Sequence, residues 1–367
     1  MRFHILGLPH TISSRTYAAC AFTQKIVRLC KMMRDRGHYV IHYGHEASEV
    51  ECDEHVTVIH EPEIVSCYGV RDWRVAGPPT TFNNGDAVHV AFNARAAAAI
   101  CDRKEPNDFL LCMWGSGHQQ CATQHSDMIV VEPGIGYGGG YFAPYRVWES
   151  YAIMHAYFGL QGIKTASNAR WYDVVIPNYF DLNDFEFREQ KSDYFLFLGR
   201  LNEGKGLHIA VQICEEIGAK LIVAGPGNFQ VETRKGGPVE DVAEYFGVAD
   251  YDQRRELLAG AKGVICPSTF IEPFNGVHVE AMLSGTPVIT SDMGAFAEYN
   301  LHGVTGYRCR TFNQFVQAAR HIGQISPIRC REWAQGMFDM NRVALKYEDY
   351  FQSLLDIRTG DGWYTLR

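Results

Sequence analysis

Short apolar runs alternate with amphipathic segments along most of this chain, and this alternation limits the folds that it can adopt. The pattern predicts a strand at Arg2–Leu8 followed by a helix to about Arg36, and later a strand at Tyr194–Leu198 followed by a helix at Leu207–Ile217. Strands separated by helices form parallel sheets, because the helix carries the chain back to the start of the next strand. Since 367 residues exceed what one core usually supports, two α/β domains are predicted.

Further elements fit the same pattern. In the first half we predict strands at His38–Tyr43, His55–His60, Asp108–Met113, Asp127–Glu132 and Val174–Ile176, and helices at Ala87–Asp102 and Arg146–Phe158. In the second half we predict strands at Lys220–Ala224, Gly263–Cys266 and Pro287–Thr290, and helices at Arg254–Ala261 and Val277–Ser284. The charged stretch Asn178–Ser192 is predicted to be a linker, and the chain after Arg329 to be helical to about Ile357. The predicted domains are residues 1–183 and 184–345, with a final segment at 346–367.

The helix after the first strand is predicted to be amphipathic. Its apolar face is formed by Phe22, Ile26, Leu29 and Met33, and the remaining surface carries Lys25, Arg28, Lys31 and Arg34. We predict that these cations face solvent. A surface for anionic lipids or for an acidic acceptor is the alternative.

Composition excludes several classes of protein. A net charge of -8 argues against nucleic acid as the main partner, because binding to a phosphate backbone needs a basic surface. The eleven cysteines include no C-x-x-C pair, and the chain opens without a signal peptide, so we expect reduced thiols in a cytoplasmic protein. No apolar run approaches the ~18 residues that span a bilayer. Contact with a membrane surface stays open.

No metal site is expected. The pairs His42 with His45 and His118 with His125 lack further ligands at a recognised spacing. Asp250 and Asp252 form a D-Y-D pattern just before a predicted helix, where a carboxylate more often caps the helix than binds a metal.

Two carboxylates lie eight residues apart in the stretch that joins two predicted strands of the second half. Glu272 falls on a loop, and Glu280 falls within a helix predicted to begin near Phe274. The unpaired N–H groups of Phe274 to Val277 would then favour an anion such as a diphosphate. The alternative is that Glu272 caps the helix and Glu280 is an exposed helical residue.

Two cations follow an apolar strand that ends at Gly199. Arg200 and Lys205 lie on a glycine-rich loop that opens the next helix. Two cations on such a loop match the charges of a diphosphate. Either cation alone would most often be a solvated surface charge.

These segments resemble the retaining GT-B glycosyltransferases of family 4. The resemblance rests on four ordered motifs: G-R-x4-K-G at Gly199–Gly206, E-x7-E at Glu272–Glu280, V-I-P-N-Y-F-D at Val175–Asp181, and G-A-F-A-E-Y-N-L-H-G-V-T-G-Y at Gly294–Tyr307. The chain differs from the family at Pro273 and Asn275, where glycines are usual.

The resemblance implies a GT-B fold, with two Rossmann-like domains facing across a cleft and a C-terminal helix that crosses back to the first domain. It implies retaining transfer of a sugar from a UDP- or GDP-sugar to a hydroxyl of a glycan, glycolipid or glycoprotein, without a metal or other cofactor. Arg200 and Lys205 would neutralise the diphosphate, Glu272 would hold the donor sugar and Glu280 the ribose. The remaining donor contacts would come from Gly199, Phe274, Asn275, Gly276 and Val277.

The first half offers weaker candidates for the reacting centre. Glu132 ends an apolar strand, at the edge where ligands collect in open α/β sheets, and five glycines follow it by position 140. The family commonly has His or Asp at this position. His118 and His10 are the other candidates. A structural role is the alternative for all three.

Other functions on the same fold stay open. A sugar-nucleotide epimerase, a phosphorylase or a non-catalytic nucleotide-sugar-binding protein would carry similar motifs. A Rossmann dehydrogenase is excluded, because Leu6–Ser13 lacks the G-x-G-x-x-G pattern. The sequence specifies neither the sugar, the base, the acceptor nor the oligomeric state.

Overall fold

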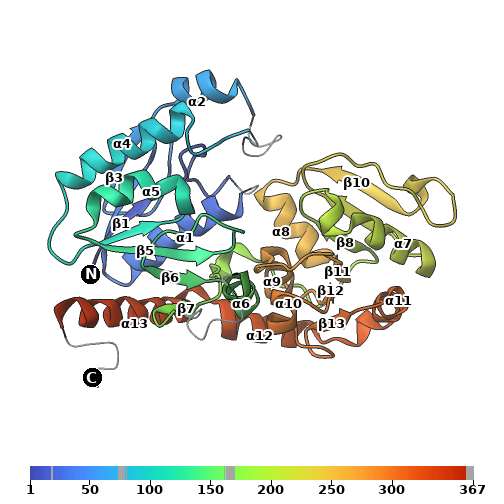
Figure 1. The fold of residues 1–367 in the computed structure, drawn as a ribbon. Helices are drawn as coiled ribbons and strands as arrows, with labels where there is room; N and C mark the ends of the chain where they lie inside the picture. The colour runs from blue at the N-terminus through green and yellow to red at the C-terminus, as the bar shows by residue number, and fades with distance from the viewer. Residues whose placement is uncertain (18–19, 73–78, 80, 161, 163–169, 361–367) are drawn as a thin grey trace. The chain divides into compact units, whose positions relative to one another are not determined.

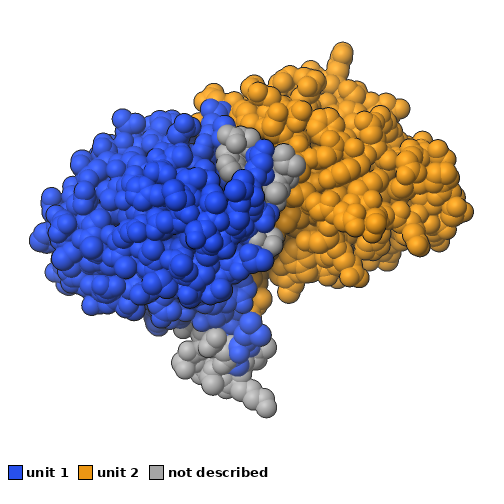
Figure 2. All heavy atoms as spheres, turned by 90° about the horizontal axis from the view of Figure 1, so that it is seen from above, with its two compact units in different colours: residues 1–149, 157–179, 340–367 blue, residues 150–156, 180–339 orange. Residues whose placement is uncertain are grey.

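The chain folds into two α/β units. The computed structural model describes residues 1–17, 20–72, 79, 81–160, 162 and 170–360. Unit 1 comprises residues 1–149, 157–179 and 340–367, and unit 2 comprises residues 150–156 and 180–339 (Figure 2). The chain passes between the units after residues 149, 156, 179 and 339, whereas the predicted boundaries are at residues 183 and 345.

Unit 1 contains a seven-stranded parallel sheet in the order β3-β2-β1-β4-β5-β6-β7 (Figure 1). Its strands are β1 (Arg2–Leu6), β2 (Tyr39–His45), β3 (Glu54–Ile59), β4 (Phe109–Cys112), β5 (Ile129–Ile135), β6 (Tyr145–Trp148) and β7 (Asp173–Val175). Its helices are α1 (Ala21–Asp35), α2 (Glu61–Tyr68), α4 (Ala87–Cys101), α5 (Gln119–Ala122) and α13 (Met340–Thr359). Helix α6 (Tyr151–Leu160) begins in unit 2 and ends in unit 1.

The C-terminal helix α13 belongs to unit 1. Its Phe351 ring packs against Phe3 of β1 and Phe109 of β4, with ring centroids 4.9 and 5.1 Å apart. Tyr347 and Leu354 join the same buried cluster. Phenylalanine rings on adjacent strands thus form the surface on which the end of the chain packs, which confirms the predicted return of a C-terminal helix to the N-terminal half.

Unit 2 contains a six-stranded parallel sheet in the order β10-β9-β8-β11-β12-β13 (Figure 1). Its strands are β8 (Phe195–Leu198), β9 (Leu221–Ala224), β10 (Ala243–Gly247), β11 (Gly263–Cys266), β12 (Val288–Ser291) and β13 (Gly306–Cys309). Its helices are α7 (Leu207–Ile217), α8 (Tyr251–Gly260), α9 (Gly276–Leu283), α10 (Ala295–Tyr299), α11 (Phe312–His321) and α12 (Pro327–Phe338). The central strands β8 and β11 are fully buried, as their unbroken apolar sequences indicate.

Three predictions about local structure are wrong. Residues Tyr145–Trp148 form strand β6 rather than the start of a helix, and Glu149 precedes α6 instead of lying on it. Lys25 does not face solvent: it is 4% exposed and forms an ion pair with Glu149. The stretch predicted as a linker contributes Phe180 and Phe185 to the core of unit 2.

In the part of the chain that the structure describes, no helix combines the length and the apolar character needed to cross a bilayer.

Candidate functional site

The two predicted motifs of unit 2 meet at one ion pair. The Lys205 ammonium lies 2.6 Å from Oε1 of Glu272, whose side chain is almost fully buried. The same oxygen accepts hydrogen bonds from the Ser268 hydroxyl at 2.6 Å and from the Asn275 amide at 3.0 Å. Among the described residues, nothing donates to Oε2 of Glu272. The carboxylate is therefore held firmly through one oxygen, and the other remains available to a ligand.

Backbone geometry positions Lys205. The Asn202 side chain accepts a hydrogen bond from the Lys205 N–H at 3.0 Å and so caps the start of a short 3₁₀ turn, Glu203–Lys205. Gly206 follows with φ +72°, and a Cβ there would lie 2.4 Å from the Pro267 carbonyl oxygen. Only glycine fits both constraints. The loop after β8 therefore lies directly against the loop after β11, which carries Glu272.

A third motif packs on the backbone of Glu272. Gly294 has φ +61°, and a Cβ there would come within 2.7 Å of the Glu272 nitrogen. The N–H of Ala295 donates to the Glu272 carbonyl at 2.9 Å. The acidic residue of this motif, Glu298, accepts from the N–H groups of Tyr151 and Ala152 at 3.0 and 2.7 Å. Glu298 thus caps the start of α6.

Helix α9 begins two residues after the start predicted near Phe274, and one residue before the predicted span Val277–Ser284. Asn275 precedes it with φ +66°, and the helix starts at Gly276. The N–H groups of Gly276 and Val277 donate to no residue in the described part of the chain. Such groups carry the positive end of the helix dipole. Phe274, in contrast, is 2% exposed and packs against Tyr299 and Phe338, so its ring belongs to the core.

Glu280 has a partner that the sequence did not reveal. Arg254 of α8 donates from Nε to Oε2 of Glu280 at 2.9 Å, and its Nη2 contacts the same oxygen. Glu280 is the fifth residue of α9. Because the two side chains come from different helices 26 residues apart, no local pattern predicts their pairing.

Arg200 differs from Lys205 in its surroundings. It is exposed and makes no ion pair or side-chain hydrogen bond with any residue that the structure describes. Gly199 before it has φ +143°, and a Cβ on neighbouring Gly225 would lie 2.0 Å from the Gly199 oxygen. The backbone of Gly199, directly before the exposed Arg200, is thus packed closely against Gly225.

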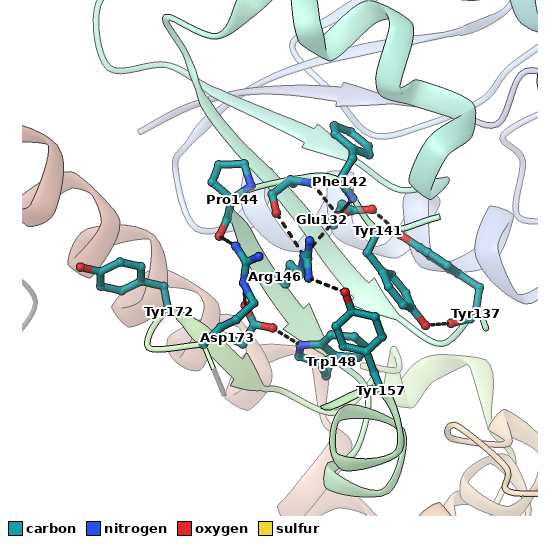
Figure 3. Close-up of polar contacts among 12 residues, drawn as sticks. Glu132, Tyr137, Tyr141, Phe142, Pro144, Arg146, Trp148, Tyr157, Tyr172 and Asp173 are labelled. Atoms are coloured by element: carbon teal, nitrogen blue, oxygen red, sulfur yellow. Dashed lines mark hydrogen bonds and ion pairs between the residues drawn. The ribbon is translucent and has the colours of Figure 1, made fainter. Parts of the chain in front are cut away.

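Glu132 lies in a fully occupied buried network in unit 1 (Figure 3). Tyr137 donates to its Oε1 at 3.0 Å, and the N–H groups of Phe142 and Ala143 donate to Oε2 at 3.0 and 2.9 Å. The Arg146 guanidinium lies 3.7 Å from Oε2. Burial raises the pKa of Glu132, and the two backbone donors oppose this rise. These contacts favour a role in fixing the loop between β5 and β6.

The same network extends to the edge of the sheet. Arg146 on β6 donates to the Ala143 carbonyl at 3.1 Å and to the Tyr157 hydroxyl at 3.4 Å. Trp148 donates from its indole nitrogen to Asp173 of β7 at 2.9 Å (Figure 3). These hydrogen bonds link polar side chains on three adjacent strands, β5, β6 and β7.

His118 and His10 are both buried and uncharged. The Trp114 N–H donates to Nδ1 of His118 at 3.2 Å, so the proton is on Nε2, which donates to the Gly7 carbonyl at 2.9 Å. Burial lowers the pKa of His118 to about 3 and that of His10 also to about 3. His10 stacks on Phe82 with ring centroids 4.2 Å apart, and its Nδ1 has no partner among the described residues. Both nitrogens of His118 are thus occupied by backbone groups.

The D-Y-D pattern has a structural explanation. The Asp250 carboxylate accepts from the Gln253 N–H at 2.9 Å, and Gln253 bonds back to the Asp250 N–H at 3.0 Å. This capping box confirms the prediction for Asp250. Within the described ranges, no three His, Cys, Asp or Glu side chains group as a metal site requires.

Comparison with known proteins links unit 2 to one family. Residues 180–326 match the family model described as glycosyl transferases group 1. An uncharacterised glycosyltransferase of Methanocaldococcus jannaschii is 31% identical over 158 residues, which are 37% of this chain and 39% of that protein. Glycogen synthase of Mycobacterium tuberculosis is 32% identical over 122 residues, which are 31% of this chain and 29% of that protein. The chain thus spans less than half the length of these curated relatives.

Solved structures share the fold of the whole chain. Sucrose-phosphate synthase from Thermosynechococcus elongatus has a TM-score of 0.71 at 15% identity, covering 97% of this chain and 100% of that one. HepE of Anabaena in complex with UDP-glucose has a TM-score of 0.65 at 16% identity, covering 96% and 100%. Together with the two parallel sheets, these similarities identify the GT-B fold.

Proposed function

We propose, on the premise that unit 2 belongs to the group 1 glycosyltransferases over residues 180–326, that the chain transfers a sugar from a nucleotide diphosphate sugar to a hydroxyl acceptor with retention at the anomeric carbon. The observation that carries the proposal is the contact between Lys205 and Glu272 at 2.6 Å. It places a cation suited to a phosphate beside a carboxylate suited to sugar hydroxyls, and the second oxygen of that carboxylate is available.

Each residue of the site then has a distinct task. An ammonium group has three N–H donors, so Lys205 can bind Glu272 with one and phosphate oxygens with the others. Arg200 supplies the second cation, and Gly276 and Val277 offer backbone N–H groups to the same diphosphate. Glu272 accepts hydrogen bonds from hydroxyls of the transferred sugar, and Glu280 from those of the ribose.

Catalysis in this proposal is mainly electrostatic. Negative charge grows on the diphosphate as the bond to the sugar breaks, and positioned cations and N–H donors stabilise that charge more in the transition state than in the ground state. Divalent cations serve this purpose in other enzymes. With two cations and a helix N-terminus present, no metal is required for this step.

Unit 1 is assigned the acceptor, a hydroxyl of a glycan, glycolipid or glycoprotein. Because both oxygens of Glu132 and both ring nitrogens of His118 already have partners, we assign these two side chains to holding the loops around the acceptor rather than to contacting the reacting atoms. The donor base is proposed to be uracil or guanine.

The experiment is a screen of UDP- and GDP-sugars for thermal stabilisation and slow hydrolysis, with and without excess EDTA. A true donor raises the melting temperature by mass action and releases nucleoside diphosphate. The proposal predicts a donor that does both, with activity retained in EDTA. A sugar nucleotide that is converted to its epimer, or stabilisation without any turnover, would favour an epimerase or a binding protein. Loss of activity in EDTA, restored by manganese, would contradict the metal-free mechanism.

A further inference from the structure

We infer that Arg254 is a positioning residue that makes the site selective for ribonucleoside over deoxyribonucleoside diphosphates. It does so by holding Oε2 of Glu280, so that Oε1 is left to accept a hydrogen bond from a ribose hydroxyl. This inference rests on the proposed function and adds a residue that lies outside the four motifs.

The two carboxylate oxygens of Glu280 differ in their contacts. Nε of Arg254 donates to Oε2 at 2.9 Å, and Nη2 contacts the same atom. No described residue donates to Oε1. A Cβ placed on Gly276 would lie 3.6 Å from Oε1, so this oxygen lies beside the start of α9 and its unpaired N–H groups. The free oxygen is therefore next to the proposed phosphate site, where a ribose would be found.

The guanidinium group is suited to this task. It is planar, always charged, and donates in a fixed fork, so two N–H groups on one oxygen restrict the rotation of the whole carboxylate. Glu280 is 9% exposed, so its carboxylate has little contact with water, and the contact with Arg254 is what fixes its direction. An ionised oxygen of fixed direction binds a hydroxyl donor more strongly than a mobile one.

Selectivity follows from the missing hydroxyl. A buried acceptor that meets a deoxyribose has no donor to bind, and it has also lost contact with water. The wild-type protein should therefore bind the ribonucleotide about 10-fold or more tightly than an analogue without the hydroxyl. Without Arg254, the carboxylate can turn toward water or another donor, and this preference should shrink.

A calorimetric titration tests the inference. The probes are UDP and GDP, and for whichever binds, its 2′-deoxy and 3′-deoxy analogues. The variants are Arg254→Gln, Arg254→Lys and the matched control Arg255→Gln, which changes the next arginine of the same helix. We expect Arg254→Gln to raise the Kd of the ribonucleotide about 10-fold and to reduce the ratio between deoxy and ribo Kd values to about 3 or less. Arg254→Lys should give a ratio of deoxy to ribo Kd values between those of Arg254→Gln and the wild type. Arg255→Gln should give the wild-type ratio.

The double variant Arg254→Gln/Glu280→Gln separates action through Glu280 from direct contact with the nucleotide. If Arg254 acts through Glu280, the two losses are not additive, because each change removes the same interaction. Circular dichroism and melting temperature establish that each variant is folded.

Several outcomes would overturn the inference. An equal loss of affinity for ribo and deoxy probes in Arg254→Gln, with the ratio unchanged, makes Arg254 a general structural residue. Additive losses in the double variant remove the route through Glu280. A wild-type protein that binds both probe types equally contradicts the ribose assignment while leaving the glycosyltransferase proposal intact. A wild-type protein that binds neither UDP nor GDP contradicts the proposed donor itself.

Discussion

Arg200 and Lys205 share a loop but lie in different environments, and this difference shapes what their removal should do. Both Arg200→Ala and Lys205→Ala should lower turnover about 100-fold or more, the scale of losing one transition-state donor. Lys205→Ala should additionally weaken donor binding, because it removes a partner of Glu272 at 2.6 Å. Initial rates with the donor found in the screen measure both effects. Lys220→Ala, at an exposed pair with Glu244 in the same unit, is the control and should behave as the wild type. Wild-type turnover in either loop variant would remove that residue from the site.

Lys25 shows where prediction at the residue scale fails. Its spacing on α1 indicates a solvated face, yet it donates to the Gly134 carbonyl at 2.7 Å and to Glu149 inside unit 1. The partner is 124 residues away, so the pattern of the helix alone carries no sign of it. The pairing of Arg254 with Glu280 is missed for the same reason. The sequence motifs, in contrast, give Lys205 and Glu272, because their spacing is itself characteristic.

The buried pair of Lys25 and Glu149 allows a direct test of stability. Lys25→Met breaks the buried ion pair with Glu149, and should lower the free energy of unfolding by about 3–5 kcal/mol. Urea unfolding followed by circular dichroism measures the change. The same substitution at Lys31, whose pair with Asp35 is partly exposed, should cost less than about 1 kcal/mol. Similar losses of unfolding free energy in the two variants would show that the buried ion pair contributes no more to stability than the partly exposed one.

At the scale of elements, helices and strands with clear ends are predicted well. Strand β11 is Gly263–Cys266 and helix α7 is Leu207–Ile217, as the sequence indicates, and α7 lies between Gly206 and Gly218, both with positive φ. The sequence over strand β6 predicts a helix instead, because Tyr145–Trp148 lies only two residues before the helical Tyr151–Leu160. In β6, burial of Arg146 against Glu132 lets a charged residue lie in the middle of a sheet.

The glycine-rich loop after β5 offers a matched pair of substitutions. A Cβ on Gly136 would lie 2.1 Å from Oε2 of Glu149, whose other oxygen is bound by Lys25, so the carboxylate cannot move without breaking the pair. Gly136→Ala should therefore lower the free energy of unfolding by about 1–3 kcal/mol. A Cβ on Gly138 would have no atom within 4 Å. Gly138→Ala should therefore change the free energy of unfolding by less than about 0.5 kcal/mol. Chemical denaturation compares the two, and equal stability would show that the loop is not held by Glu149.

At the scale of the whole molecule, the two parallel sheets and the return of α13 to unit 1 are predictable from the alternation of elements and the motifs. The start of that helix is not predicted correctly, because the predicted segment begins at residue 346 and α13 begins at Met340. The break between α12 and α13 at Asp339 involves neither glycine nor proline, so the sequence there resembles one continuous helix.

Buried histidines in both units predict how stability depends on pH. Burial lowers the pKa of His118 and His42 in unit 1 to about 3 and that of His278 in unit 2 to about 4, from 6.5. Below pH 6.5 the unfolded chain therefore binds more protons than the folded one, so the free energy of unfolding falls as pH falls. Each histidine should contribute about 1 kcal/mol per pH unit to this fall down to its folded pKa.

Urea titrations between pH 7 and 5 measure that slope. His118→Gln keeps a donor for the Gly7 carbonyl. It should reduce the change in unfolding free energy per pH unit for unit 1. A slope unchanged by this substitution would mean that His118 does not titrate as its burial indicates.

The division of labour between Glu272 and Glu280 is tested most directly by titrating the nucleoside diphosphate alone, without its sugar, into two variants. Glu280→Gln should weaken binding of the free nucleotide and of the donor alike, because the ribose changes little during the reaction. Glu272→Gln should bind the free nucleotide nearly as the wild type does, yet turn over the sugar donor far more slowly. Equal loss of nucleotide affinity in both variants would contradict this division, and no loss of affinity or turnover in either would contradict the glycosyltransferase site itself.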